Sequence, residues 1–480
     1  MICAMSWPRR WASEAGWGSD VRDFRRSERI MSGKGGRKYD IGLALLNLSA
    51  WIRAQPWLRR IYRYFPEALR FRVSRLLAAR AGQAVRFGRS AAWQRSAPPV
   101  TAPIGNALAP VDGIAGVNVF AYARGQFGLA ESARLYARAL MLAGIPVAVY
   151  DITLDLAHSM GDDSLDAHIG MDTPHPINLI FVNPDYLDGA IANIGRERLL
   201  NRRNIACWFW ELERFPDDWL PALAEVDEIL ASSAFIADII RRVTDKPVLH
   251  VPLPVSAQSD SGLQRADFGL GEHDFVFLCS FDFNSFLARK NPLATIAAFR
   301  RAFTGEHADV RLLIKSSNGH RHPERLRELL NAAAQDRRIL VRDEVLERSH
   351  VQALQRCADA YVSLHRSEGF GLGLAECMRI GKPVIATGWS GNMEFMTPEN
   401  SCLVNYRLTP VAEGEYSYHS GQRWAEPDID HAARYMRRLV DDKDFAAQIG
   451  ARAAQDIHMQ LSPEIIAAAF IKHFTRTDIE

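Results

Sequence analysis

The sequence lacks the marks of a disulfide-stapled, zinc-binding or membrane-spanning protein. Its 480 residues include only 6 cysteines, and none of them forms a C-x-x-C pair. We therefore expect reduced, buried thiols in place of a disulfide or zinc framework. The apolar segment at residues 41–52 stops at Arg53, short of the ~20 residues that a bilayer-spanning helix needs. Arginines interrupt residues 1–30, so no cleavable signal segment is expected, and Met31 is an alternative start.

Acidic residues are scarce at one end of the chain only. Residues 1–100 contain 20 Lys and Arg against 6 Asp and Glu, whereas the remaining 380 residues contain 38 and 50. Apolar residues recur at three- and four-residue steps between arginines in residues 58–76, which predicts basic amphipathic helices. Two interpretations are equally supported: residues 41–82 bind the surface of an anionic membrane, or their apolar stripe packs on the rest of the protein. Nucleic acid is not expected as a partner, because the apolar spacing suits a membrane or a protein surface better.

Beyond a linker rich in proline and alanine at residues 96–110, short β-branched or aromatic runs that predict strands, such as residues 205–210 and 228–231, alternate with helical patterns. This alternation predicts an α/β protein with parallel sheets covered on both faces. We expect two doubly wound Rossmann-like domains that face a cleft, with ligand at the carboxyl ends of the strands. The predicted parts are a basic helical extension with its linker (1–112), an N-terminal domain (113–258), a C-terminal domain (259–460) and a final helix (461–480) that crosses back to the N-terminal domain.

A glycine-rich loop with two carboxylates follows the predicted strand at residues 359–364. Glu368 and Glu376 are separated by seven residues, and a helix is predicted to start between them. A flexible loop that enters a helix presents free N–H groups and the positive end of a dipole, which favours a phosphate. Carboxylates on either side of that anion suit the hydroxyls of a sugar and a ribose. The loop therefore predicts a sugar-nucleotide site.

Other loops of the C-terminal half also follow predicted strands. One leads from residues 281–285 to Arg289 and Lys290, which would offset the charge of a diphosphate. The others are residues 315–319 and a glycine-bearing loop at residues 387–394. Each feature alone is more often structural, as a solvated helix end or a carboxylate favoured by a helix dipole. Four such loops at the strand ends of one domain favour a binding site.

These motifs resemble the E-x7-E region of family 4 retaining glycosyltransferases, of GT-B fold. The similarity rests on Glu368 to Glu376 with Gly369-Phe370-Gly371-Leu372, on the segments 381–387 and 391–392, and on Arg289-Lys290-Asn291-Pro292. Residues 125–132 resemble the first glycine loop of the family. Residues 208–212 and 227–235 resemble a bacterial, group-1-type branch of it. The resemblance covers about residues 114–475 and leaves the basic extension unexplained.

The resemblance implies roles for single residues. Arg289 and Lys290 would bind and stabilise the leaving diphosphate. Glu368, with backbone N–H groups from Phe370 to Leu372, would hold the donor sugar, and these three side chains are the predicted catalytic residues. Glu376 would hold the ribose. The further donor-binding residues would be Gly128, Ser285, Gly369, Phe370, Gly371, Leu372, Gly391 and Asn392.

The chain departs from the family at two positions. Where members often carry a histidine, this sequence has Trp210 and Glu211, which we assign to the acceptor side. Where many members have an earlier arginine, it offers Ser285 as a phosphate donor.

The implied activity is transfer of a hexose-type sugar from a nucleotide diphosphate to a hydroxyl, with retention of configuration. The acceptor would be a lipid-linked or cell-surface glycan, and the enzyme would be cytoplasmic, at the inner face of the membrane. No cofactor or metal is implied, since the D-x-D string at Asp428–Asp430 suits a helix N-terminus. The alternatives are a non-catalytic sugar-nucleotide-binding or scaffold subunit of a polysaccharide assembly complex, and a GT-B sugar-nucleotide epimerase.

Overall fold

The computed structural model describes residues 114, 116–154, 158, 160–257, 261–305 and 307–475. The predicted basic extension, including residues 41–82, lies outside these residues. Within the described part, every helix is too short or too polar to cross a bilayer.

The N-terminal part contains a six-stranded parallel sheet in the order β2-β1-β3-β4-β5-β6. Its strands and α-helices are β1 (Val117–Ala121), α5 (Gly128–Leu142), β2 (Val147–Asp151), β3 (Ile177–Ile180), α6 (Pro184–Ile194), β4 (Arg203–Cys207), β5 (Glu228–Ala231), α7 (Ala234–Arg241) and β6 (Val248–His250). Most strand residues are buried, as is typical of a parallel sheet with helices on its faces.

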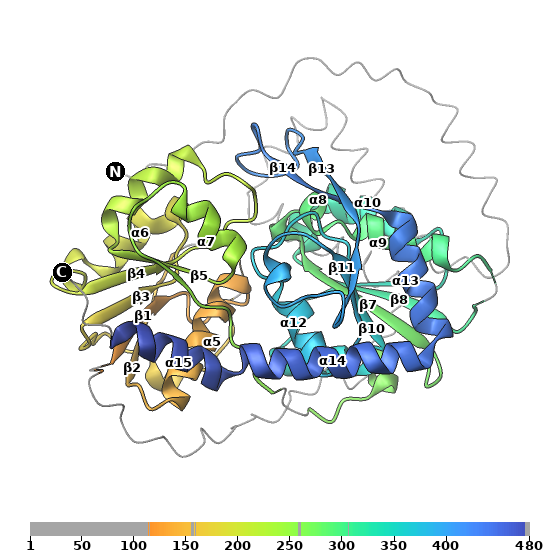
Figure 1. The fold of residues 1–480 in the computed structure, drawn as a ribbon, viewed down its shortest axis with the longest axis horizontal. Helices are drawn as coiled ribbons and strands as arrows, with labels where there is room; N and C mark the ends of the chain where they lie inside the picture. Colours follow the sequence, from red (N-terminus) through yellow and green to blue (C-terminus); the bar gives the residue numbers. More distant parts are fainter. Residues whose placement is uncertain are drawn as a thin grey trace, which may run out of the picture.

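The C-terminal part contains a second six-stranded parallel sheet, in the order β12-β11-β10-β7-β8-β9. Its elements are β7 (Phe275–Asp282), α8 (Leu287–Lys290), α9 (Pro292–Ala302), β8 (Val310–Ser317), α10 (Pro323–Ala333), β9 (Ile339–Asp343), α11 (Arg348–Cys357), β10 (Ala360–Ser363), α12 (Leu372–Arg379), β11 (Val384–Thr387), β12 (Cys402–Val404) and α13 (Ile429–Asp441). Figure 1 shows the two sheets side by side, each with its own helices. The predicted fold class, two doubly wound parallel sheets, is confirmed.

One predicted strand was placed too far along the chain. We expected a strand over residues 205–210, but β4 ends at Cys207 and the next residues form a loop. Trp208 is nevertheless fully buried, and Trp210 is 3% exposed. The aromatic run reflects burial in a packed loop, which composition alone does not distinguish from a strand.

Two features connect the domains (Figure 1). Helix α14 (Lys443–Leu461) runs along the C-terminal domain, and α15 (Pro463–Phe474) lies against α5 of the N-terminal domain, where the rings of Tyr136 and Phe470 are 5.3 Å apart. An antiparallel hairpin, formed by β13 (Tyr406–Pro410) and β14 (Arg423–Pro427), lies between β12 and α13 along the chain. This hairpin was not predicted from the sequence.

Candidate functional site

A buried cluster of charges lies at the carboxyl ends of β7 and β10. The Lys290 Nζ atom lies 2.5 Å from Glu368 Oε1, and Arg289 Nη1 lies 3.4 Å from Glu368 Oε2. Arg289 also donates to the carbonyl of Ser367 at 2.9 Å. Arg289 is 4% exposed and Glu368 8%. The structure thus brings together the three residues predicted to be catalytic.

Burial and charge act against each other in this cluster. Burial opposes the charge of Glu368, but Lys290 and Arg289 outweigh it and lower the pKa of the carboxyl to about 2. Burial lowers the pKa of Lys290, and Glu368 offsets part of that shift. Burial also opposes the charge of Arg289, yet Glu211 and Glu368 raise its pKa. Glu368 is therefore ionised at neutral pH, and the cluster has two cations beside this carboxylate.

Backbone geometry fixes the orientation of the two cations. They lie on the short helix α8, which ends at Asn291 in a left-handed conformation with φ of 49°. The Asn291 side chain accepts a hydrogen bond from Ala294 N–H at 3.4 Å, and α9 starts at Pro292. Asparagine tolerates this conformation and proline suits the first helical position. Arg366 donates from its guanidinium to the carbonyl of Ala288 at 2.9 Å and from its N–H to the carbonyl of Arg289 at 2.7 Å.

Two glycines, one in the loop after β10 and one in the loop after β11, occupy positions that other residues do not suit. Gly371, the N-cap of α12, has a φ of +96°. A Cβ atom on Gly391 would lie 2.0 Å from the carbonyl oxygen of Gly369. Gly391 instead donates its N–H to the carbonyl of Glu368 at 2.9 Å. The two glycine-bearing loops therefore hold each other, and with them the backbone of Glu368.

Asn392 and Ser285, predicted to bind the donor, both form hydrogen bonds with other residues of the chain. The fully buried Asn392 amide contacts His365 Nε2 at 3.1 Å and donates to the carbonyl of Thr387 at 3.0 Å. The carbonyl of Ser285 accepts from Arg289 Nε at 3.2 Å. The Asn392 side chain thus positions His365 and does not point to open space. Gly128 differs, because it is exposed at the start of α5 and a Cβ there would meet no atom within 4 Å.

Glu376 is 4% exposed and has partners of its own. One carboxylate oxygen accepts from the Arg348 guanidinium and the other from Gln355 Nε2 at 2.9 Å, both on α11. Arg348 also approaches Glu131 of α5, with 3.4 Å between Nε and Oε1. Burial opposes the charge of Arg348, but Glu376 and Glu131 raise its pKa. A ribose at Glu376 would share this carboxylate with Arg348, and the assignment of Glu376 to the ribose stays a prediction.

The two residues assigned to the acceptor side lie in different surroundings. Trp210 is buried, donates its indole N–H to the carbonyl of Arg214 at 2.8 Å and packs edge-on against Trp219. The Trp210 side chain therefore packs in the core of the N-terminal domain. Glu211 instead reaches the charge cluster across the domains, with Oε1 at 3.6 Å from Arg289 Nη2.

Several site residues had no signal in the sequence. Arg348 and Gln355 are ordinary positions of an amphipathic helix, and only tertiary packing places them at Glu376. Ser233 donates its hydroxyl to the carbonyl of Gly369 at 2.7 Å, across the two domains. Tyr416 donates to Glu211 Oε2 at 2.6 Å from the unpredicted hairpin.

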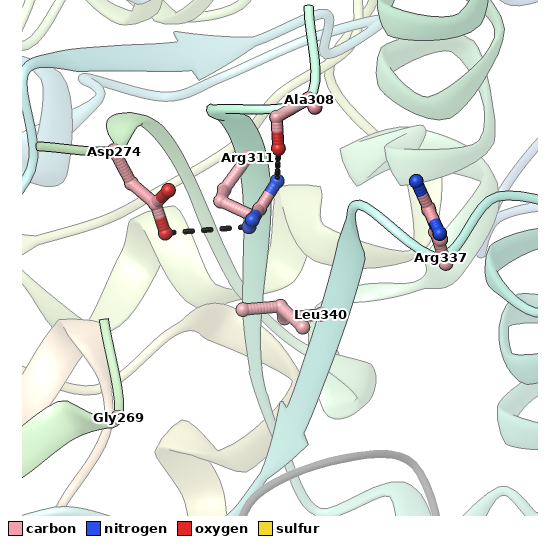
Figure 2. A pocket seen from close by; sticks show the side chains of 6 residues that line it. All are labelled: Gly269, Asp274, Ala308, Arg311, Arg337 and Leu340. Carbon is pink, nitrogen blue, oxygen red and sulfur yellow. Dashed lines mark hydrogen bonds and ion pairs between the residues drawn. The ribbon is translucent and has the colours of Figure 1, made fainter. Parts of the chain in front are cut away.

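A separate pocket lies at the opposite, amino-terminal end of the C-terminal sheet. Figure 2 shows its lining, which includes Arg337 and the ion pair between Arg311 Nε and Asp274 Oδ2 at 3.3 Å. None of the predicted site residues lines it.

Asp428 of the D-x-D string caps α13 by accepting from His431 N–H at 2.9 Å. Among the residues that the structure describes, no group of three His, Cys, Asp or Glu side chains could hold a metal.

Comparisons with known proteins agree with this geometry. Residues 273–412 match the model of the family described as glycosyl transferases group 1. Sucrose-phosphate synthase from Thermosynechococcus elongatus is similar in structure, with a TM-score of 0.56 and 16% identity over 75% of this chain and 98% of that chain.

Two further solved structures are similar. They are a glycosyltransferase from Rickettsia africae (TM-score 0.55, 14% identity, 76% of this chain and 98% of that chain) and Anabaena Alr3699/HepE in complex with UDP and glucose (TM-score 0.51, 15% identity, 75% and 99%). No curated protein matches the chain. At these identities the likeness shows the fold, which is GT-B as expected.

Proposed function

We propose that this chain, whose residues 273–412 match the family model of group 1 glycosyltransferases, transfers a hexose from a nucleoside diphosphate to a hydroxyl acceptor with retention of configuration. The observation that carries the proposal is the convergence of Arg289, Lys290 and Glu368 at the carboxyl ends of β7 and β10. Ligands in doubly wound folds bind at this edge of the sheet.

The charges of the cluster fit the bond that breaks. As the anomeric carbon separates from the diphosphate, negative charge grows on the phosphate oxygens. Arg289 and Lys290 are already in place to receive it, and buried donors aimed at developing charge are typically worth about 2.7–4 kcal/mol each. The carboxylate of Glu368 keeps both cations oriented, and its remaining lone pairs accept from hydroxyls of the donor sugar.

The donor is the first thing to test. UDP-glucose is the starting candidate, since Anabaena Alr3699/HepE, of the same fold, has been solved with UDP and glucose. A thermal-shift panel of UDP, GDP and ADP, followed by release of nucleotide from the matching sugar nucleotides, identifies base and sugar. We expect one base to stabilise the protein clearly more than the others. If no nucleoside diphosphate binds and no sugar nucleotide is turned over, the proposal is wrong.

For the acceptor, we propose a lipid-linked or cell-surface glycan, reached from the cytoplasmic face of a membrane. The support is the charge of residues 1–100, with 20 basic and 6 acidic residues, and the apolar spacing within residues 41–82. Basic segments of this kind are attracted to anionic lipids by about 1 kcal/mol per Lys or Arg near the surface. The full chain should pellet with vesicles rich in phosphatidylglycerol and a chain that starts at residue 101 should not. Equal pelleting of both chains would contradict the membrane contact.

A further inference from the structure

The hairpin of β13 and β14 joins the two domains next to the charge cluster. It belongs to the C-terminal domain, but its tip contacts the loop after β4 in the N-terminal domain. Gln422 Nε2 donates to the carbonyl of Arg214 at 2.7 Å, and the Tyr418 hydroxyl accepts from Trp219 Nε1 at 3.2 Å. Figure 1 shows the hairpin at the side of the C-terminal domain that faces the N-terminal domain. Most of it lies beyond residue 412, where the family match ends.

Tyr416, in the loop of this hairpin, contacts the cluster directly. Its hydroxyl donates to Glu211 Oε2 at 2.6 Å, and its ring centroid lies 5.8 Å from the Cζ atom of Arg289. The ring also packs on Phe286 at 4.7 Å between centroids. Phe286 has a φ of 64°, a conformation that a bulky residue adopts only when its surroundings enforce it. Phe286 precedes α8, so Tyr416 packs on the residue that starts the helix of Arg289.

The distances around Arg289 indicate the role of the Tyr416 hydroxyl. The Nε and Nη1 atoms of Arg289 donate three hydrogen bonds, to the carbonyls of Ser285 and Ser367 and to the carboxylate of Glu368. The remaining nitrogen, Nη2, faces Glu211 Oε1 at 3.6 Å. A charge-assisted hydrogen bond is about 2.7–2.9 Å long, so Glu211 stands beside Arg289 without forming a full pair. Its short hydrogen bond is the one to Tyr416.

We propose that Tyr416 is a positioning residue, which holds Glu211 away from Arg289 Nη2 and so leaves that edge of the guanidinium for the diphosphate of the donor. Glu211 and a diphosphate are two anions that compete for one cation. A hydroxyl donor stabilises the carboxylate without using the arginine. The inference rests on the proposed function, because it needs a diphosphate ligand, and it adds a residue outside the family match to the donor site.

The test is Tyr416→Phe, which keeps the ring and removes the hydroxyl. Without that donor Glu211 moves onto Arg289, so the Kd for UDP and the donor KM should both rise about tenfold, the scale of one hydrogen bond to a charged group. If GDP or ADP gives the largest thermal shift, that nucleoside diphosphate replaces UDP in these measurements. Tyr418→Phe is the matched control, since it removes a hydroxyl of the same hairpin that contacts Trp219 and not the cluster. The Kd of Tyr418→Phe for UDP should stay within about twofold of the Kd of the unaltered protein.

The double variant separates positioning from a general structural role. In a Glu211→Gln background, which lacks the competing charge, Tyr416→Phe should change the Kd for UDP less than twofold; full additivity would contradict the proposal. Glu211→Gln alone should bind UDP as tightly as the unaltered protein or more tightly. This readout stands even if Tyr416→Phe fails to fold, and weaker UDP binding by Glu211→Gln would overturn the inference.

The outcomes also separate this inference from the proposed function. If the unaltered protein binds and turns over a donor while Tyr416→Phe leaves Kd and KM unchanged, only the role of Tyr416 is wrong. If the unaltered protein binds no nucleoside diphosphate, both proposals are wrong.

Discussion

The two glutamates of the E-x7-E motif are both buried, yet their surroundings differ. Glu368 pairs with Lys290 and Arg289, which lie on helix α8 of the same domain. Glu376 pairs with Arg348, which also approaches Glu131 on the first helix of the other domain. One end of the motif therefore sits in a charge cluster suited to the leaving group. The other end is connected to the N-terminal domain, so changes at Glu368 and at Glu376 should have different consequences.

The largest expected effect is on the Glu368 side, from Lys290→Ala. It removes one of the two cations that we propose bind the leaving diphosphate, and it leaves Glu368 with Arg289 alone. We expect kcat to fall about 10²–10³-fold, as for other preorganised donors. The measurement is initial-rate transfer or nucleotide release. Lys382→Ala is the control, because the Lys382 ammonium contacts the carbonyl of Arg356, away from the cluster. Near-normal turnover in Lys290→Ala would show that the donor lies elsewhere.

A glycine exchange tests how rigidly the Glu368 side is built. Gly391→Ala forces a Cβ onto the carbonyl of Gly369, 2.0 Å away, and should lower the free energy of unfolding by about 1–3 kcal/mol. Gly128→Ala places a Cβ in open space and should stabilise the first helix by about 0.5–1 kcal/mol. Urea denaturation measures both. If Gly128→Ala also weakens UDP binding, the predicted approach of that loop to the phosphates gains support.

A smaller effect is expected on the Glu376 side. Glu376→Gln weakens the contact with Arg348 and the predicted contact with the ribose, which takes no part in bond breaking. Donor KM should rise about tenfold with little change in kcat, because uniform binding is lost. Glu131→Gln is the comparison variant, since it weakens the contact of Arg348 across the domains, together with the pair between Glu131 and Arg134, and leaves Glu376 unchanged. A fall in kcat as large as that of Lys290→Ala would contradict the distinction between the two glutamates.

The last expected effect is on stability and not on catalysis: the free energy of unfolding should depend on pH. The cluster lowers the pKa of Glu368 from its usual 4.5 to about 2, so its ionisation stabilises the folded state above pH 4.5. That contribution is lost as the pH falls from 4.5 toward 2. The difference in unfolding free energy between the unaltered protein and Glu368→Gln should therefore shrink over this range. A difference that stays constant from pH 6 to pH 3 would mean that Glu368 is not ion-paired in solution.

Much of the fold could be predicted, because strands and helices of a doubly wound sheet have distinct apolar patterns. The strand at Glu228–Ala231 was placed with its observed limits, and α12 starts inside the glycine loop as expected. The hairpin escaped prediction because β13 is only five residues long and largely exposed, so no buried apolar run marks it in the sequence. Trp210 was assigned to the acceptor side because it lies where members of the resembled family often carry a histidine, whereas its side chain is buried against Trp219.

By itself the sequence determined the two sheets and the order of their strands along the chain. It also placed the arginine, the lysine and the two glutamates in segments that follow strands, because local periodicity and turn residues depend on near neighbours. Tertiary structure alone decided the partners of those charges. Glu211 meets Arg289, Arg348 meets Glu376 and Tyr416 meets Glu211 across tens or hundreds of residues. Such pairs form only after the domains and the hairpin have packed, since no local pattern records which side chains burial will bring together.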